Sequence, residues 1–202
     1  MKVKQFFVQG WDKNFSYLLW DTKSQKGVVV DPNGNLGELL DFIQNQEIQI
    51  QAIVNTHGHR DHTELNQALK DLFQVPIVGH KEEPYAKDKE VVDGEVWEVG
   101  EGKLQFLHTP GHSPGSICIL TENHLVTGDT LFVGRSGKTS FPGGSPEKMF
   151  QSMVRLRSLP DETVIYPGHD YGDWPTSTIG KEKEYNQCLM ANTVEEFKAL
   201  GI

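Results

Sequence analysis

The sequence predicts an α/β fold in which two mixed halves, each built of strands and helices, pack as a layered sandwich with the helices outside. Two observations lead to this prediction. Short apolar runs that end in turn residues alternate with segments whose apolar residues recur at helical spacing. No internal repeat, low-complexity tract or linker divides the chain, so we expect residues 1–202 to form a single domain.

Three strand-like runs open the first half, and each is closed by a turn signal: KQFFVQG, NFSYLLWD and KGVVVDP. A helix is expected next, because apolar residues recur at helical spacing between Leu36 and Ile43. IQAIVNTH and VPIVGH predict two buried strands, with a second helix between them whose apolar face runs from Leu65 to Phe73. The first half therefore alternates strand, helix and strand.

The second half repeats this order with different turns. KLQFLHTPGH, SICILTENH and LVTGDTLF predict strands that end in glycine-containing turns. The segment MFQSMVRLRSL has helical apolar spacing from Met149 to Leu159. TVIYPGHD predicts the last strand, and EEFKAL predicts a short terminal helix.

Composition restricts the partners and the compartment. The net charge is −9, and basic residues are interspersed with acidic ones, which weighs against a nucleic-acid partner. No stretch approaches the roughly 20 apolar residues of a membrane helix, so no membrane segment is expected. Neither Cys118 nor Cys188 has a CxxC partner. We therefore expect Cys118 to be a packed thiol and the protein to be cytoplasmic.

Metal-competent side chains follow four of the predicted strands, in IVNTHGHRDH, FLHTPGH, LVTGD and VIYPGHD. Loops at the carboxyl ends of strands converge in α/β sheets. Imidazole and carboxylate groups are ligands that suit zinc and non-haem iron. The candidate ligands are His57, His59, Asp61, His62, His112, Asp129 and His169. Seven ligands are more than one tetrahedral ion needs, whereas two ions sharing one carboxylate would use them all.

A different interpretation is open for Asp61. Asp61 and Glu64 fit a capping box at the start of the following helix, so Asp61 could be an N-cap and not a ligand. His57 and His59 alternate on an extended segment and therefore face the same side, which favours ligation.

Three further histidines have weaker signals. His80 and His124 are expected at the surface or at strand ends. His108, just before TPGH, is expected to pack or to orient a ligand.

The motifs HGHRDH, TPGHSPGS, TGDTLF and YPGHDYG, in this order, resemble those of the metallo-β-lactamase fold superfamily. Within it they most resemble the branch of type II glyoxalases (hydroxyacylglutathione hydrolases) and persulfide dioxygenases. The similarity implies a four-layer αββα sandwich of two mixed sheets with outer helices. It also implies two metal ions, the first bound by His57, His59 and His112, the second by Asp61, His62 and His169, and both bridged by Asp129.

The resemblance implies a metal-dependent hydrolase that uses a metal-bridging hydroxide to cleave a small thioester such as an acylglutathione. The ions would be two divalent metals, zinc first and iron as the alternative. Asp61 and Asp129 are the candidate catalytic carboxylates, since Asp61 could orient the hydroxide while it ligates. Lys138 and Tyr171 match a basic residue and an aromatic residue that contact glutathione in type II glyoxalases. A small-molecule, glutathione-linked substrate is therefore expected, and the sequence carries no information on the oligomeric state.

Two alternatives stay open. Persulfide dioxygenases keep these motif residues but bind one iron through positions that match His57, His112 and Asp129, and they oxidise glutathione persulfide with O2. Ligand identity alone does not separate the two reactions, because outer residues also tune a metal site. A non-catalytic metal-binding module would need a closed, saturated site, which a hydroxide position between two ions argues against.

Overall fold

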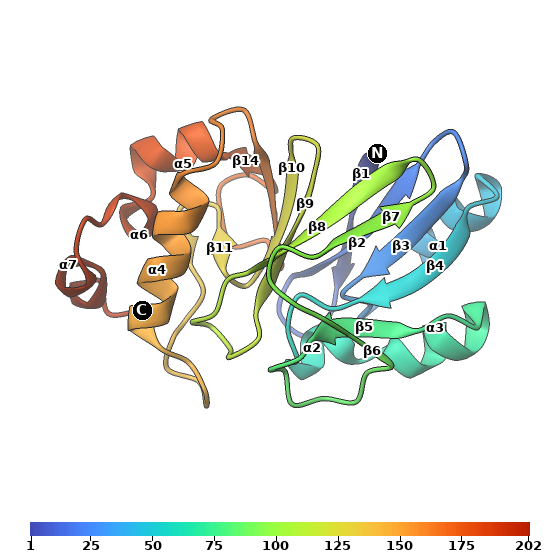
Figure 1. Cartoon of the computed structure of the whole chain (residues 1–202), viewed down its shortest axis with the longest axis horizontal. Coiled ribbons are helices and arrows are strands. Elements are labelled where there is room, and N and C mark those ends of the chain that lie inside the picture. The colour runs from blue at the N-terminus through green and yellow to red at the C-terminus, as the bar shows by residue number, and fades with distance from the viewer.

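Two six-stranded sheets lie between two layers of helices in the structure, a computed structural model that describes all 202 residues (Figure 1). The first sheet has the strand order β1-β2-β3-β4-β5-β6, and the second has the order β14-β13-β10-β9-β8-β7. The first comprises β1 (Lys2–Gln9), β2 (Asn14–Asp21), β3 (Lys26–Val30), β4 (Gln49–Val54), β5 (Ile77–His80) and β6 (Lys89–Val91). The second comprises β7 (Val96–Val99), β8 (Gly102–His108), β9 (Ile117–Thr121), β10 (His124–Gly128), β13 (Val164–Pro167) and β14 (Ser177–Thr178). A separate hairpin joins β11 (Leu131–Phe132) to β12 (Arg135–Ser136).

Both sheets are mixed, as the sequence predicts. In the first sheet β1, β2 and β3 pair antiparallel, whereas β3, β4, β5 and β6 pair parallel. In the second sheet β10 and β13 are parallel and the other pairs are antiparallel. The αββα class is therefore confirmed.

The helices cover the outer faces of the sheets. Two helices, α1 (Gly37–Asn45) and α3 (Asn66–Phe73), pack their apolar residues on the first sheet. Four others pack on the second sheet: α4 (Pro146–Arg157), α5 (Ile179–Tyr185), α6 (Gln187–Met190) and α7 (Val194–Ala199). No helix has the length and apolar character needed to cross a membrane.

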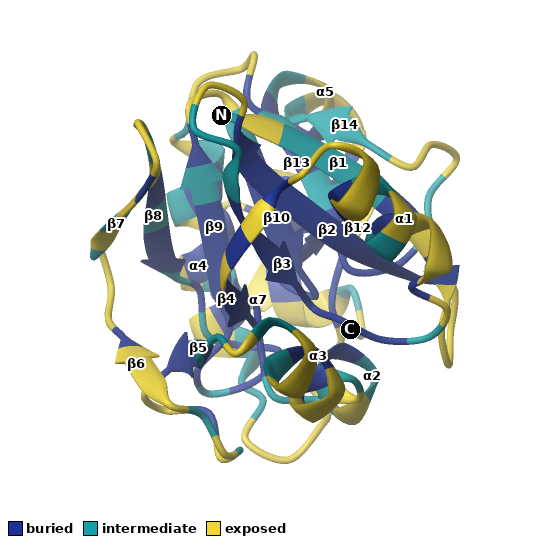
Figure 2. Ribbon diagram, turned by 90° about the vertical axis from the view of Figure 1, so that its right-hand side faces the viewer, coloured by how far each residue is buried: buried dark blue, intermediate teal, exposed yellow.

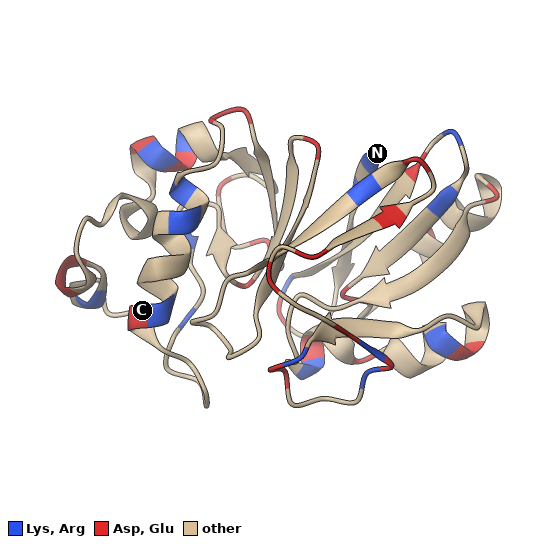
Figure 3. Cartoon of the chain, in the orientation of Figure 1, with Lys and Arg blue, Asp and Glu red and all other residues tan.

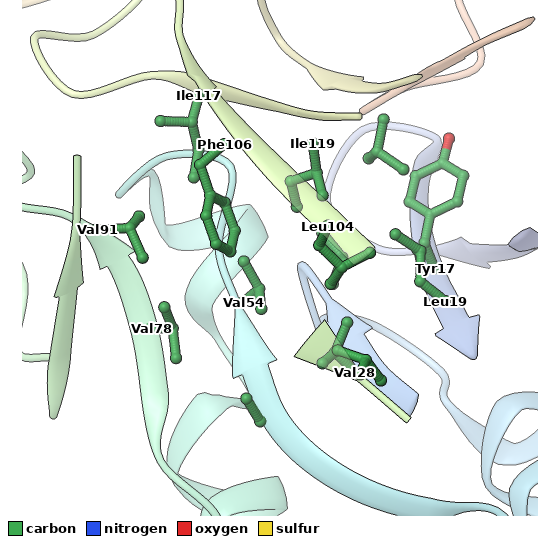
Figure 4. Packing of buried hydrophobic residues seen from close by; sticks show 14 of the residues in the cluster. Tyr17, Leu19, Val28, Val54, Val78, Val91, Leu104, Phe106, Ile117 and Ile119 are labelled. Atoms are coloured by element: carbon green, nitrogen blue, oxygen red, sulfur yellow. The ribbon is translucent and has the colours of Figure 1, made fainter. Parts of the chain in front are cut away.

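The main core fills the space between the two sheets (Figure 4). Strand β2 is buried along its whole length, since its two faces pack against different layers (Figure 2). Tyr17 and Leu19 face the second sheet, whereas Leu18 and Trp20 face the helices. Burial of one such side chain stabilises the fold by about 1.5–3 kcal/mol. The continuous apolar run 17–20 within β2 is thus explained by burial on two sides.

The structure corrects several details of the predicted elements. LVTGDTLF is not one strand, because β10 ends at Gly128 (φ 48°) and the chain turns before β11. Strands β6, β7, β12 and β14 and helices α5 and α6 have no counterpart in the sequence prediction. Each of the missed strands has two to four residues, too few for a periodic pattern.

One edge of the sandwich brings the two sheets into direct contact through their loops. The backbone N–H of Ile117, in the second sheet, donates to the carbonyl of Thr56 after β4 (2.8 Å). The N–H of Phe15, in β2, donates to the carbonyl of Gly168 after β13 (2.8 Å). Around this edge and over the rest of the chain, acidic and basic residues are interspersed and form no block of one sign (Figure 3). Loops from both sheets therefore meet at this edge with fixed positions.

Candidate metal centre

All seven candidate ligands lie together at this edge, in the loops that follow β4, β8, β10 and β13. Four are in the loop after β4 and in the short helix α2 (Arg60–Thr63), and each of the other loops provides one. The buried ones are His57, His62, His112, Asp129 and His169, and the partly exposed ones are His59 and Asp61. The tertiary structure thus brings together side chains separated by up to 112 positions, from 57 to 169.

Three imidazoles form one part of the centre, the triple-histidine half (His57, His59 and His112). Nδ1 of His59 lies 3.0 Å from Nε2 of His57 and 3.0 Å from Nε2 of His112. Two nitrogens bound to one tetrahedral zinc ion are about 3.3 Å apart, given a Zn–N distance of about 2.05 Å. The observed spacing fits three ligands of one ion.

Two imidazoles and a carboxylate form the other part, the aspartate half (Asp61, His62 and His169). The Nε2 atoms of His62 and His169 are 3.2 Å apart. Oδ2 of Asp61 lies 3.4 Å from Nε2 of His169 and 3.7 Å from Nε2 of His62. These three groups also fit a single ion.

The carboxylate of Asp129 lies between the two halves. Its Oδ2 is 3.5 Å from Nε2 of His112 and 3.2 Å from Nε2 of His169, and its Oδ1 is 3.3 Å from Nε2 of His62. Oδ1 is buried and accepts no hydrogen bond. An unpartnered buried oxygen costs free energy. A negatively charged oxygen surrounded by imidazole nitrogens is suited to a cation. The donor set therefore suits a divalent metal.

Asp31 holds two of the histidines from behind. Nδ1 of His62 donates to Oδ2 of Asp31 (3.0 Å), and the Thr56 hydroxyl donates to the same oxygen (2.6 Å). Because that hydroxyl proton is used, Nδ1 of His57 donates to Oγ1 of Thr56 (3.1 Å). Both imidazoles then present the lone pair of Nε2 to the centre, as metal-binding histidines do.

Backbone carbonyls orient two further histidines in the same way. Nδ1 of His112 donates to the carbonyl of Lys138 (2.8 Å), and Nδ1 of His169 donates to the carbonyl of Asp12 (2.6 Å). Their Nε2 atoms also face the centre. Four of the five imidazoles are therefore fixed in one tautomer by an oxygen outside the centre.

Histidines of the two halves have pKa values shifted in opposite directions. Burial lowers the pKa of His57 and of His59, and neighbouring imidazoles lower both further. Burial also lowers the pKa of His62 and His169, but nearby acceptors together outweigh it and raise both. The acceptors are Asp129 and Asp31 at His62, and Asp129 and the Asp12 carbonyl at His169. Burial raises the pKa of Asp129, yet these two imidazoles hold it well below its usual range. Negative charge is thus concentrated beside the aspartate half.

Asp61 is not a helix cap, so the capping-box interpretation is wrong. Helix α2 begins at Arg60, its N-cap is His59, and no side chain caps it. Asp61 lies inside the first turn and Glu64 lies at the C-cap. The Nδ2 group of Asn14 donates to Oδ2 of Asp61 (3.0 Å) and orients the carboxylate toward the centre.

The other histidines lie outside the centre. His80 ends β5 and is buried rather than at the surface, and its ring stacks on that of His108 (3.9 Å, 15°). Nε2 of His108 donates to the carbonyl of Pro114 (2.9 Å). An imidazole lone pair lies in the ring plane, so two parallel stacked rings do not converge on one ion, although Glu82 lies beside them. His124, partly exposed, starts β10 as expected for a strand end.

A cavity of about 190 Å³ opens onto the centre. Lys138 is exposed in its wall, while its backbone carbonyl holds His112. The ring of Tyr171 stacks on that of His169 (4.8 Å, 3°), and its hydroxyl donates to the Asp12 carboxylate (2.5 Å). A larger cavity of about 520 Å³ is also lined by Tyr171 but by none of the candidate metal ligands. The larger of the two cavities is therefore not the one at the candidate metal centre.

Sequence reasoning missed three residues around the centre: Asp12, Asn14 and Asp31. A signal existed for Asp31, because VVVDP has the same order as LVTGD, an apolar strand followed by a carboxylate. Asp12 and Asn14 lie in a polar hairpin turn, GWDKN, in which nothing in the sequence points toward a distant loop.

A model of the metallo-beta-lactamase superfamily matches residues 9–169, which include all seven candidate ligands. The chain belongs to the metallo-beta-lactamase superfamily. Two curated relatives cover most of it. The probable polyketide biosynthesis zinc-dependent hydrolase PksB of Bacillus subtilis is 31% identical over 94% of this chain and 87% of its own. The hydroxyacylglutathione hydrolase GloC of Haemophilus influenzae is 30% identical over 94% and 98%.

Solved structures of the superfamily share the fold. ETHE1 from Myxococcus xanthus has a TM-score of 0.91 and 31% identity over 99% of this chain and 89% of that one. TTHA1623, solved in a di-iron-bound form, has a TM-score of 0.77 and 27% identity over 92% and 98%. The expected superfamily is therefore confirmed, and its members include proteins described with zinc and with iron.

Proposed function

We propose that this protein is a metal-dependent hydrolase that cleaves a small thioester, such as an acylglutathione, with two divalent metal ions. The observation that carries the proposal is the position of Asp129, whose two carboxylate oxygens face both halves of the centre. The triple-histidine half would hold one ion and the aspartate half the other. Zinc is the first choice because the donors are imidazoles and carboxylates, with iron as the alternative.

Two divalent ions held here would supply a hydroxide at neutral pH and polarise the thioester carbonyl. The chain would orient the reactants around them. Asp61 is partly exposed to the cavity and fixed by Asn14, so its Oδ2 can accept a hydrogen bond from the attacking water. The leaving thiolate has a parent pKa of about 8.5, so its departure does not depend on a side-chain acid.

The substrate proposal depends on the rim of the cavity and on the relatives. The ammonium group of Lys138 is exposed in the wall and suits a substrate carboxylate. Tyr171 offers an aromatic face next to His169. GloC, named as a hydroxyacylglutathione hydrolase, supports a glutathione-linked thioester. PksB is named as a zinc-dependent hydrolase. It supports hydrolysis as the reaction class, but its name does not mention glutathione.

The second candidate is an iron-dependent persulfide dioxygenase that oxidises glutathione persulfide. It needs one iron at His57, His112 and Asp129, and Oδ2 of Asp129 lies 3.5 Å from Nε2 of His112. TTHA1623, solved in a di-iron-bound form, supports iron as the metal but with two ions and not one. In this scheme the aspartate half holds no metal.

Metal analysis of the purified protein, with S-lactoylglutathione hydrolysis and persulfide-dependent O2 uptake measured side by side, separates the two functions. We expect two metal ions per chain and thioester cleavage. One iron per chain with O2 uptake would overturn the hydrolase. Inactivity in both assays with two bound ions would point to another acyl or lactone substrate.

Asp61→Asn sharpens the same experiment. The substitution keeps the shape of the side chain but removes a charged ligand that only the two-metal scheme uses. We expect hydrolysis to fall by about 100-fold or more. If O2 uptake is present and unaffected by Asp61→Asn, the one-iron scheme is correct.

A further inference from the structure

Glu83 is a buried carboxylate that touches both loops of the triple-histidine half. It lies in the connection between β5 and β6 and is only 4% exposed. Its Oε2 accepts a hydrogen bond from the backbone N–H of Gly58 (2.7 Å). Its Oε1 accepts one from the N–H of Gly115 (2.7 Å) and another from the Ser113 hydroxyl. A single side chain thus holds two separate loops.

These two loops belong to different sheets. Gly58 stands between His57 and His59 in the loop after β4 of the first sheet, and Ser113 directly follows His112 in the loop after β8 of the second. The distances between the three histidines of this half therefore depend on the relative position of the two sheets. Among their neighbours, Glu83 bonds to both loops at once.

The glycines at these positions are explained by Glu83. A Cβ atom on Gly58 would lie 2.5 Å from Oε2 of Glu83, and one on Gly115 would lie 2.7 Å from the Glu83 nitrogen. Real Cβ atoms do not approach other atoms so closely. Gly58 thus leaves room for the Glu83 carboxylate, and Gly115 leaves room for the backbone and the first side-chain carbons of Glu83. Hydrogen bonds from a backbone N–H to a carboxylate are stronger than those to a neutral acceptor.

We propose that Glu83 is a positioning residue that sets the spacing of His57, His59 and His112 and thereby the metal affinity of the triple-histidine half. The inference rests on the proposed metal-binding role of these histidines. Glu83 touches no candidate ligand side chain. It acts through the backbone on both sides of the half, and it makes no contact with the aspartate half.

The test is a Zn²⁺ titration of chelator-treated protein against a competing chromophoric chelator, which gives an affinity for each half. His59→Gln and Asp61→Asn assign the two steps. We expect Glu83→Gln to weaken the triple-histidine half by about 10–100-fold and to change the aspartate half by less than about threefold. Glu83→Asp keeps the charge but is too short to reach both loops, and it should weaken the same half.

Asp21 provides a matched control at the opposite edge of the sandwich. Its carboxylate accepts hydrogen bonds from the Ser24 hydroxyl (2.7 Å) and from the N–H of Glu101 (3.0 Å), and so joins a turn of the first sheet to a turn of the second. Asp21→Asn should lower the melting temperature without changing either Zn²⁺ affinity. An equal loss of affinity in Asp21→Asn would mean that general destabilisation is responsible and would overturn the inference.

The other possible results of the Zn²⁺ titration also test the role of Glu83. Unchanged affinity of the triple-histidine half in Glu83→Gln, or an equal loss in both halves, would overturn the positioning role while leaving the proposed function intact. If the wild-type protein binds no Zn²⁺, the proposed function fails first. Should Glu83→Gln not fold, Ser113→Ala removes one of the three donors and should weaken the same half by about 2–10-fold; no change would count against the inference.

Discussion

The two halves of the candidate metal centre are built from similar side chains but are prepared differently. In the triple-histidine half, burial lowers the pKa of His57 and His59, so these imidazoles are neutral and ready to donate a lone pair. In the aspartate half, carboxylates raise the pKa of His62 and His169 despite burial. A metal ion must displace protons from this half. One edge of the fold thus holds two histidines whose pKa is lowered beside two whose pKa is raised.

The halves also differ in most of the groups that support them, although Asp31 reaches His57 through Thr56 as well as His62 directly. Loops from two sheets form the triple-histidine half, with Glu83 between them. Polar groups from the amino-terminal strands form the support of the aspartate half, where Asp31 holds His62 and Asn14 holds Asp61. Perturbation of one support should therefore affect one half more than the other.

The largest loss of activity is expected on substitution of Asp129, because this residue faces both halves of the centre. Asp129→Ala removes the only carboxylate that faces both halves. Because bound metal contributes several kcal/mol to such a reaction, we expect activity to fall on the order of 1,000-fold and metal content to fall in both halves. Metal analysis and turnover measure this, with the exposed Asp71→Ala as control. Turnover like that of the wild type would overturn the site assignment.

Asp31→Asn should lower the metal affinity of one half more than that of the other. Asp31 has a left-handed backbone (φ 50°), which asparagine also tolerates, so the fold should be retained. The variant loses the charge that holds His62 and the Thr56 hydroxyl. We expect Zn²⁺ affinity to fall by about 10–100-fold, more in the aspartate half, since His57 is held only through Thr56. An equal loss in the triple-histidine half would contradict the comparison.

Lys138→Ala should leave both halves intact. The backbone carbonyl that orients His112 is kept, and only the exposed ammonium group at the cavity is lost. If that group binds a substrate carboxylate, KM for S-lactoylglutathione should rise by about tenfold with little change in kcat. Lys148→Ala, on α4, is the control. A fall in metal content would assign Lys138 to the centre and not to the substrate.

The smallest effect is a difference in pH dependence in chelator-treated protein. The folded pKa of His169 is raised, so its contribution to stability is present below its unfolded pKa of about 6.5 and is lost as pH rises through the folded value. The folded pKa of His59 is lowered, so its contribution is lost as pH falls below about 6.5.

Melting temperatures of His169→Gln and His59→Gln, measured from pH 5 to 8.5 and compared with wild type, check this. The advantage of wild type over His169→Gln should shrink toward high pH, and its advantage over His59→Gln should shrink toward low pH. The same trend in both variants would show that the halves do not differ in protonation.

Much of the fold was predictable because long, regular segments carry periodic apolar patterns. The core strands β2, β3, β4 and β5 and the helices α1, α3 and α4 lie where these patterns place them. The short strands lie outside such patterns, since their pairing is decided by distant partners. Asp61 was ambiguous for a related reason. Its spacing to Glu64 suits a cap, and only the start of α2 at Arg60 excludes one.

The sequence by itself determined the donor types, their order and their place after four apolar strands, because these are local properties of a segment. The resemblance of the motifs implied how the seven side chains divide into two halves, whereas the tertiary structure decided which oxygens hold them from behind. Asp31 and His62 are 31 positions apart, and Asn14 and Asp61 are 47 apart. Glu83 joins loops 25 and 32 positions away. Such contacts depend on strand order and sheet packing, and no local pattern encodes these.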